Sequence, residues 1–429
     1  MSVLDDSALV DLVRRRAITH DLTNELVSRI GERRIVMLGE STHGTHEFYE
    51  WRRRVTVALL RRNPNAFVAV EGDWPACANV RKYIRAGGAS GARQSLEGFR
   101  RWPTWMWANL EILKLIEELR ALSLRGFPHG LYGLDVYSLF ESMEAVIRQT
   151  ERVDPLLAKR LRAHYACFDP FSRDERAYAK SLLGVPEGCE RAALDALREL
   201  LRARALSSEI DGERLFDAAQ NARIVADAEN YYRTMMLGNE DSWNVRDRHM
   251  MDTLNRLLVH HGPDSQAIVW AHNTHIGDYR ATDMAGHGLV NLGGLAREEW
   301  GESAVFLVGL STYEGAAVSS KAWEGRVERQ RVPPAKPGTV EAAFHKAGFP
   351  ECAVVFERED RRNAFADMRG QRAIGVVYDP AYEHFSNYSP TSLAKRYDAF
   401  VFWDRSIALT PIELEFDRNE LPETWPAGF

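Results

Sequence analysis

The chain has 429 residues, of which 45% are hydrophobic and 27% charged, and these are the proportions of a folded globular protein. Its length exceeds that of one ordinary compact domain and predicts a large core with an insertion, or two domains. The net charge of −6, from 55 Lys and Arg against 61 Asp and Glu, argues against a general nucleic-acid-binding protein.

The amino-terminal segment and the cysteines bear on the cellular compartment. Residues 1–16 begin with acidic side chains and contain no apolar core, unlike a secretory signal. No apolar run reaches the roughly 18 residues of a membrane span. The cysteines are far apart and contain no CxxC pair; they are Cys77, Cys167, Cys189 and Cys352. We therefore expect no disulfide framework, no structural zinc site and a reducing, cytoplasmic location.

Short apolar runs alternate with amphipathic stretches in the first third of the chain. The pattern predicts strands at 35–40, 67–72 and 130–135, and helices at about 45–62, 75–86 and 106–124. Strands that alternate with helices form a parallel or mostly parallel sheet covered on both faces.

The middle third changes character. From about 138 to 262 there is no convincing strand pattern, and Arg, Ala, Leu and Glu recur at helical spacing, which predicts an insertion of about four to six helices. Strands are then predicted at 267–273, 304–312, 352–357, 372–379 and 398–404, with a loop or hairpin at 313–340. The predicted fold is α/β, a mostly parallel central sheet flanked by helices. The core halves are 1–137 and 263–429, and the helical insertion is 138–262.

Acidic and histidine side chains follow four of the predicted strands. In open α/β sheets, ligands bind beyond the carboxyl ends of the strands. These side chains therefore predict one shared site, although caps and solvated loop residues would give the same pattern, above all for Asp135. In chain order they are Glu40, His43, Glu71, Asp73, Asp135, His272 and His275.

One arginine of the first long helix falls on its apolar side. Arg52 lies within the stripe, whereas Arg53 and Arg54 lie outside it; the stripe is Phe48, Trp51, Val55 and Leu59. A core-facing guanidinium is costly unless it meets an anion, so we expect Arg52 in the site rather than in a merely structural pair. His46 projects from the other side and is expected to support the site or to face solvent. Thr42 or Thr45 is expected to cap this helix.

Two further groups are site candidates. His272 and His275 are separated by the small residues Asn273 and Thr274, which allow a tight turn that aims both rings into one cavity; two unrelated surface histidines are the alternative.

The tryptophans are expected to line an apolar substrate cleft, although core packing explains them equally well; they are Trp74, Trp102, Trp105 and Trp107. With Asp135, we assign Trp74 and Trp105 to substrate binding.

Several catalytic motifs are absent from the sequence. It contains no GxSxG elbow, no HExxH zinc motif, no P-loop and no dinucleotide-binding glycine fingerprint. An ordinary serine hydrolase is therefore disfavoured, and attack by an activated water is the simpler mechanism. Ser41, beside Glu40, is the one serine that is still a candidate nucleophile.

Five motifs in this order resemble the erythromycin esterase family. They are GESTHG with His43, VAVEGDW with Glu71, YGLD with Asp135, NVRDRHM at 244–250, and WAHNTHIGD with the histidine pair. The resemblance runs from about residue 30 to about 405. It implies an α/β core with a helical insertion and hydrolysis of the macrolactone ester of erythromycin-type macrolides, an antibiotic-resistance activity.

The resemblance also implies site residues. His43 is expected to be the general base, with Glu40, Glu71, Arg52, His272 and His275 around it. We assign Glu71 to fixing the His43 tautomer, Glu40 to holding the water, and Arg52 with His272 or His275 to stabilising the oxyanion.

Two other functions are compatible with the same residues. One is a metal-dependent hydrolase; its ligands would be Glu40, His43, Glu71, His272 and His275. The other is a non-catalytic protein that binds a small hydrophobic ligand. The preferred prediction needs no cofactor and takes a small-molecule ester or lactone, with no nucleic-acid or membrane partner.

Overall fold

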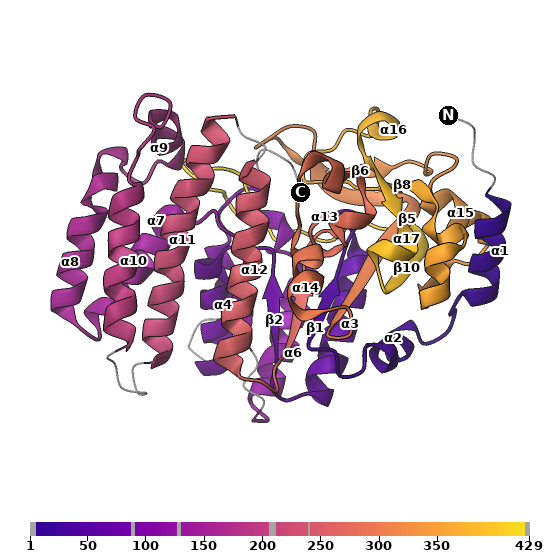
Figure 1. Ribbon diagram of the computed structural model, residues 1–429, viewed down its shortest axis with the longest axis horizontal. Helices are drawn as coiled ribbons and strands as arrows, with labels where there is room; N and C mark the ends of the chain where they lie inside the picture. Colours follow the sequence, from indigo (N-terminus) through magenta and orange to yellow (C-terminus); the bar gives the residue numbers. More distant parts are fainter. Residues whose placement is uncertain (1–5, 87–90, 127–129, 206–211, 239–240, 425–429) are drawn as a thin grey trace.

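The structure is a computed structural model that describes residues 6–86, 91–126, 130–205, 212–238 and 241–424. A central eight-stranded sheet has helices on both faces, and further helices stand beside one of its edges, to the left in Figure 1. The predicted α/β class, a mostly parallel sheet flanked by helices, is confirmed.

The central sheet has the order β3-β2-β4-β1-β5-β10-β7, and β6 pairs with β5. Its strands are parallel to their neighbours except that β7 is antiparallel to β10 and β6 to β5. Their bounds are β1 Ile35–Leu38, β2 Ala66–Val70, β3 Leu131–Gly133, β4 Gln266–Trp270, β5 Val305–Ser320, β6 Val327–Val332, β7 Glu351–Val355 and β10 Ala399–Ser406. A separate two-stranded sheet pairs β8 Met368–Arg372 with β9 Tyr388–Ser392.

The stretch predicted as a helical insertion forms six α-helices and no strand within its described residues. They are α7 Leu139–Glu151, α8 Pro155–Tyr165, α9 Glu175–Ser181, α10 Glu190–Ala205, α11 Gly212–Met236 and α12 Asp241–His261. The other helices are α1 Ser7–Arg16, α2 Leu22–Ile30, α3 His46–Arg62, α4 Trp74–Ala86, α5 Ala92–Ser95, α6 Leu110–Ser123, α13 Asn273–Ile276, α14 Leu292–Trp300, α15 Val340–Ala347, α16 Glu383–Ser386 and α17 Leu393–Arg396.

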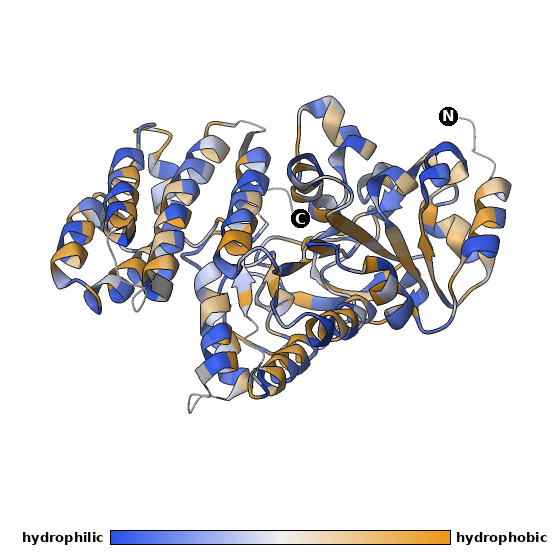
Figure 2. Ribbon diagram, turned by 60° about the horizontal axis from the view of Figure 1, so that its bottom comes forward, coloured by the Kyte–Doolittle hydropathy of each residue, from blue (hydrophilic) through white to orange (hydrophobic). Residues whose placement is uncertain are grey.

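The sheet separates two hydrophobic cores. Alternate side chains of a strand point to opposite faces, so Val36 and Leu38 of β1 pack with α3 and α6, whereas Ile35 and Met37 pack with α1 and α12. Figure 2 shows the hydrophobic strands enclosed by helices with hydrophilic outer faces. The same division separates the four tryptophans, because Trp74 lies in the second core and the other three in the first. The predicted single tryptophan-lined cleft is therefore wrong.

Two details of the predicted strands change. Residues 313–320 continue β5, which then pairs with β6 as a hairpin. The strand predicted at 372–379 is wrong, because β8 ends at Arg372 and Ile374 and Val377 make only isolated bridges, to Thr42 and Ser320. Ile374 is buried against the loop after β1, whereas Val377 is half-buried beside the end of β5.

One prediction about the cysteines is also wrong. Cys167 and Cys189 form a disulfide within the helical insertion, between residues 22 positions apart. Cys77 and Cys352 are free and buried. The sequence does not predict this disulfide, because the two cysteines are far apart without a CxxC motif and their segments come together only when the helical insertion folds. No helix among the described residues is both long and apolar enough to cross a bilayer.

Candidate active site

Four adjacent parallel strands deliver the predicted side chains to one edge of the sheet. Because β3, β2, β4 and β1 are neighbours and parallel, the residues that follow them meet beyond their carboxyl ends. The helix α12 adds two more residues from the insertion, Arg246 and Asp247. Every side chain of this group is at most 2% exposed; the group is Glu40, His43, Arg52, Glu71, Asp135, Arg246, Asp247, His272 and His275.

The loops after β1 and β4 are locked together. A side-chain Cβ at Gly39 would lie 2.1 Å from Asn273 Oδ1, so only glycine fits there. The Asn273 backbone N–H donates to the Glu40 backbone carbonyl at 2.8 Å. This close approach holds the rings of His43 and His272 with their centroids 5.0 Å apart.

His43 is held through one nitrogen only. Its Nδ1 lies 3.1 Å from Glu40 Oε1, and Glu40 Oε2 accepts a 2.6 Å hydrogen bond from Arg52 Nη2. The Glu40 carboxylate fixes the proton on Nδ1, which leaves the lone pair on Nε2. That Nε2 is buried and has no hydrogen-bond partner among the described residues. His43 is therefore arranged as a base.

The sequence of α3 explains why Arg52 is available to hold Glu40. Its guanidinium is fully buried, as the apolar stripe predicts, whereas Arg54 is exposed. It lies 4.4 Å from the ring centre of Tyr49 and 4.6 Å from that of Trp270. Two aromatic faces and one carboxylate replace its hydration.

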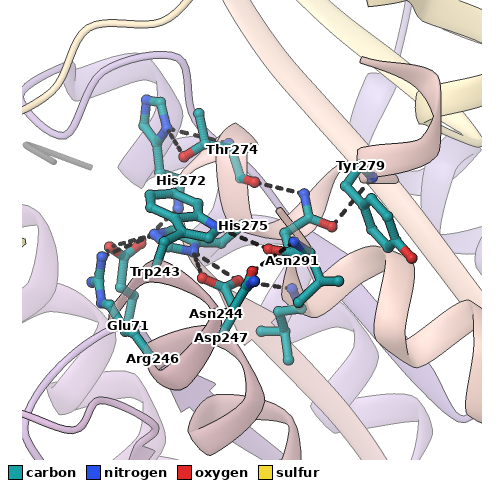
Figure 3. A network of polar contacts seen from close by, with 12 residues as sticks. Glu71, Trp243, Asn244, Arg246, Asp247, His272, Thr274, His275, Tyr279 and Asn291 are labelled. Atoms are coloured by element: carbon teal, nitrogen blue, oxygen red, sulfur yellow. Dashed lines mark hydrogen bonds and ion pairs between the residues drawn. The ribbon is translucent and has the colours of Figure 1, made fainter. Parts of the chain in front are cut away.

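Glu71 belongs to a second polar cluster (Figure 3). Its Oε2 accepts from the His272 backbone N–H at 2.8 Å, and its Oε1 accepts from Arg246 Nη2 at 2.7 Å. Burial raises the pKa of Glu71, but the positive charges of His275 and Arg246 outweigh burial and leave it lowered. Glu71 is thus an ionised group that positions the His272 backbone.

Arg246 joins this cluster to the end of β3. It donates to both carboxylate oxygens of Asp135, at 3.0 and 2.7 Å, and its Nη1 lies 3.0 Å from His275 Nε2. Such a two-point contact between a guanidinium and a carboxylate fixes orientation as well as charge. Asp135 is therefore a partner of Arg246 rather than an open ligand-binding group.

Both nitrogens of His275 are engaged. Its Nδ1 lies 2.9 Å from Asp247 Oδ2, and the ring stacks on Trp243 at 4.7 Å with an interplanar angle of 6°. Burial lowers the pKa of His275, but the carboxylates of Asp247 and Glu71 outweigh it and leave it raised. The Nε2 of His275 lies 3.0 Å from Arg246 Nη1 and 3.5 Å from Glu71 Oε1.

His272 has the opposite character. Burial and the nearby His43 hold its pKa well below the usual value, so the ring is neutral at pH 7. Its Nδ1 accepts from the Thr274 backbone N–H at 3.3 Å, which places the ring proton on Nε2. A hydrogen bond with the Ser41 backbone acts the other way and raises the pKa of His272, but it is a smaller effect, so His272 is a neutral N–H donor beside His43.

The structure brings together all six predicted catalytic side chains but revises one assigned contact. The carboxylate on His43 Nδ1 belongs to Glu40, not to Glu71. Arg52 Nη2 is bound to Glu40, whereas its Nε and Nη1 have no hydrogen-bond partner in the described structure. His46, 29% exposed in its side chain, pairs with Glu111 away from this centre. The Ser41 hydroxyl accepts from Ser311. Thr45 is the N-cap residue of α3, as one of the two predicted candidates, but its side chain bonds Thr42 rather than a backbone N–H of the helix.

The substrate-binding assignments fit the geometry less well. Trp74 Nε1 donates to Asp217 at 2.8 Å within the second core, and Trp105 is packed in the first. Neither tryptophan lies among the contacts of His43 or His272 described above. No group of three or more His, Cys, Asp or Glu side chains in the described parts of the chain is arranged to hold a metal ion, which includes the alternative ligand set.

Arg246 and Asp247 are the site residues that sequence reasoning missed. Trp243, Arg246 and Asp247 share the face of α12 that also buries Met250 and Leu254. Two charged residues within an apolar helical stripe are the same signal that identified Arg52.

Comparisons with known proteins agree with this fold. A family model for erythromycin esterase matches residues 65–406. A protein from Bacillus cereus is 18% identical with a TM-score of 0.79, over 95% of this chain and 100% of that one. A succinoglycan biosynthesis protein is 19% identical with a TM-score of 0.75, over 94% and 97% of the two chains.

A mutant of the erythromycin esterase EreC in its open conformation is 16% identical with a TM-score of 0.65, over 93% of this chain and 95% of that one. At these identities the three structures establish the shared fold, whereas the family model covers most of the chain. The protein belongs to the erythromycin esterase family.

Proposed function

We propose that this protein hydrolyses a carboxylic ester or lactone by direct attack of a water molecule that His43 deprotonates. The observation that carries the proposal is the buried Nε2 of His43, which has no partner in the described structure while its Nδ1 is held by Glu40. A neutral imidazole with a fixed tautomer is suited to accept the proton of water at neutral pH.

The protons and bonds balance without a cofactor. Water attacks the acyl carbon as its proton moves to His43 Nε2, and the carbonyl oxygen becomes an oxyanion. Collapse of this intermediate breaks the carbon–oxygen bond of the ester. The imidazolium returns the proton to the departing alkoxide, and Glu40 stabilises the imidazolium in between.

His272 is the better candidate to stabilise the oxyanion. It is neutral, carries its ring proton on Nε2 and lies beside His43, whereas Nε2 of His275 faces the Arg246 guanidinium, which can only donate. Losing one such donor typically costs about 2.7–4 kcal/mol of barrier. Glu71, Arg246 and His275 would then act by fixing the backbone that carries His272.

Substrate entry requires movement of the segments that cover the centre. Ile374 N–H donates to the Ser41 carbonyl at 2.8 Å, and Leu409 N–H donates to the Gly44 carbonyl at 3.1 Å. These two segments lie against the loop that carries His43. The macrolactone of an erythromycin-type macrolide is the substrate candidate that family membership offers, and simpler esters and lactones are chemically equivalent tests.

The proposal is tested by incubating the purified protein with a panel of macrolides, lactones and simple esters and detecting the gain of one water by mass. We expect at least one substrate, with turnover abolished in His43→Ala and retained in His46→Ala, the matched control three residues along the chain. Tight binding of a compound without hydrolysis would support a non-catalytic protein instead. Near wild-type turnover of His43→Ala would remove His43 as the base.

A further inference from the structure

A basic cleft lies between the α/β core and the helical insertion. It has a volume of about 660 Å³ and is bounded by α4, α7, the start of α11 and the end of α12, with Tyr132 of β3. Figure 1 shows these helices side by side to the left of the sheet. None of the nine active-site side chains lines it, so the cleft is a separate feature of the molecule.

The charge of the cleft is one-sided. Six cationic side chains line it, and they are Arg81, Lys82, Arg85, Arg148, Arg152 and Arg214. Its one lining carboxylate, Asp217, is already bound by Arg81 at 2.7 Å and by Trp74 at 2.8 Å. Lys82, Arg148, Arg152 and Arg214 are exposed. This concentration of positive charge occurs in a chain whose net charge is −6.

Compensation of helix dipoles does not account for all of these cations. Arg85 and Arg148 lie near the carboxyl ends of α4 and α7, where positive charge stabilises a helix. Arg214, however, lies in the first turn of α11, where a cation is unfavourable.

Polar and aromatic groups of the wall complete a binding surface. The Arg81 guanidinium lies 4.5 Å from the ring centre of Tyr132, which limits its freedom. The rings of Phe216 and His260 stack at 3.9 Å with an angle of 9°. Asn221, only 1% exposed, has an Oδ1 without a hydrogen-bond partner in the described structure. The wall thus offers oriented guanidinium groups, a flat ring pair and an unused acceptor.

The positive charge of the cleft also affects the neighbouring His261. Burial and the positive charges of His260, Arg85 and Arg81 lower the pKa of His261 to about 3. Its Nε2 lies 3.0 Å from the Tyr132 hydroxyl, which keeps it next to the wall of the cleft.

We propose that this cleft binds a small phosphate-bearing anion. One guanidinium group can donate two parallel hydrogen bonds to two oxygens of a phosphate, and arginine is therefore the preferred side chain for phosphate recognition. The volume falls within the range of small-molecule sites, which occur preferentially where two structural units meet. A free diphosphate and a nucleoside diphosphate share the recognised chemistry, and the stacked rings offer a platform only for the second.

The test is calorimetric titration of the full-length protein with inorganic pyrophosphate and, separately, with ADP. We expect one site per chain, a rise in unfolding temperature with ligand, and a roughly tenfold or greater loss of affinity for both probes in Lys82→Glu/Arg148→Glu. Arg191→Glu/Arg326→Glu changes the charge equally at side chains that are 96% and 88% exposed, and should bind as the wild type does.

The ADP arm separates the two sources. Tighter binding of ADP than of pyrophosphate would indicate that the adenine base contacts the Phe216–His260 pair. Equal affinity for the two probes would indicate that the cleft recognises only their phosphate groups. Absence of saturable binding of either probe would overturn the proposal. Equal weakening in the control pair would also overturn it, since general charge attraction would then explain the binding. Ester hydrolysis is measured in parallel, so failure of the active-site proposal is seen independently.

Discussion

Replacing Glu40 with Gln should abolish catalysis by reversing the tautomer of His43. Glu40 accepts hydrogen bonds from Arg52 at 2.6 Å and from His43 Nδ1 at 3.1 Å. A Gln side chain has one acceptor oxygen and one amino group. Because Arg52 can only donate, the amide oxygen must face Arg52, and the amino group then faces Nδ1. The His43 proton moves to Nε2, where the lone pair of the base is needed.

The expected loss of kcat is large. Reversal of the tautomer of a catalytic histidine by a carboxylate-to-amide change costs about 10⁴-fold in a serine protease. The substitution also breaks a buried ion pair, which destabilises a fold by about 3–5 kcal/mol. Arg52→Gln breaks the same pair but leaves the carboxylate on His43, so it should lose at most about 10²-fold through misplacement.

The assay compares the two variants on one hydrolysed ester at saturating concentration, with urea unfolding of each protein. Equal destabilisation with a much larger loss of kcat in Glu40→Gln supports the tautomer argument. A Glu40→Gln enzyme within about tenfold of wild type would refute it, because the typical loss of 10⁴-fold would be absent. Similar losses in both variants would assign the effect to the ion pair alone.

Two of the remaining predictions concern the active site, and one concerns the disulfide of the helical insertion. His272→Phe should lower kcat by about 10²–10³-fold at unchanged KM, and His272→Gln, which keeps an N–H donor, should lose less. The pKa of Glu71 is lowered in the folded protein, so ionised Glu71 stabilises the fold fully above the unfolded pKa of about 4.5, and this stabilisation is lost as the pH falls below that value. The difference in unfolding free energy between wild type and Glu71→Gln should therefore shrink from about pH 6 to about pH 3. A constant difference would contradict this. Cys167→Ser should cost about 3 kcal/mol of stability, from the 22-residue separation of Cys167 and Cys189, and should make the unfolding temperature insensitive to reductant. Persistent sensitivity would place the reducible bond elsewhere.

Local patterns were sufficient to predict the sheet and much of the candidate site. The residues of β1, β2 and β4 are buried at every position, and all but Gln266 are apolar, because both faces of a central parallel strand are covered. Parallel order then implies that polar residues after these strands meet. Arg52 was identified because its helical phase contradicted its charge, and its complete burial agrees with that argument.

The remaining features depend on tertiary contacts that leave weak local signals. Whether Glu40 or Glu71 reaches His43 depends on side-chain direction in two loops, and both carboxylates follow strands in the same way. The apolar run near Ile374 reads like a strand, but Ile374 bridges Thr42 in the active-site loop and Val377 bridges Ser320. The Cys167–Cys189 pair similarly depends on how helices of the insertion meet.

Arg246 connects the helical insertion to the core through buried ion pairs. Arg246 comes from the insertion and is 2% exposed, while its partners Glu71 and Asp135 come from the core and are fully buried. Removing one member of a buried ion pair costs about 3–5 kcal/mol because a charge is left without a partner. Docking of α12 therefore stabilises the core carboxylates, and Glu71 in turn holds the His272 backbone at 2.8 Å. A shift of α12 would reach the proposed oxyanion donor through only two hydrogen bonds, so the geometry of the insertion and the catalytic geometry are set together.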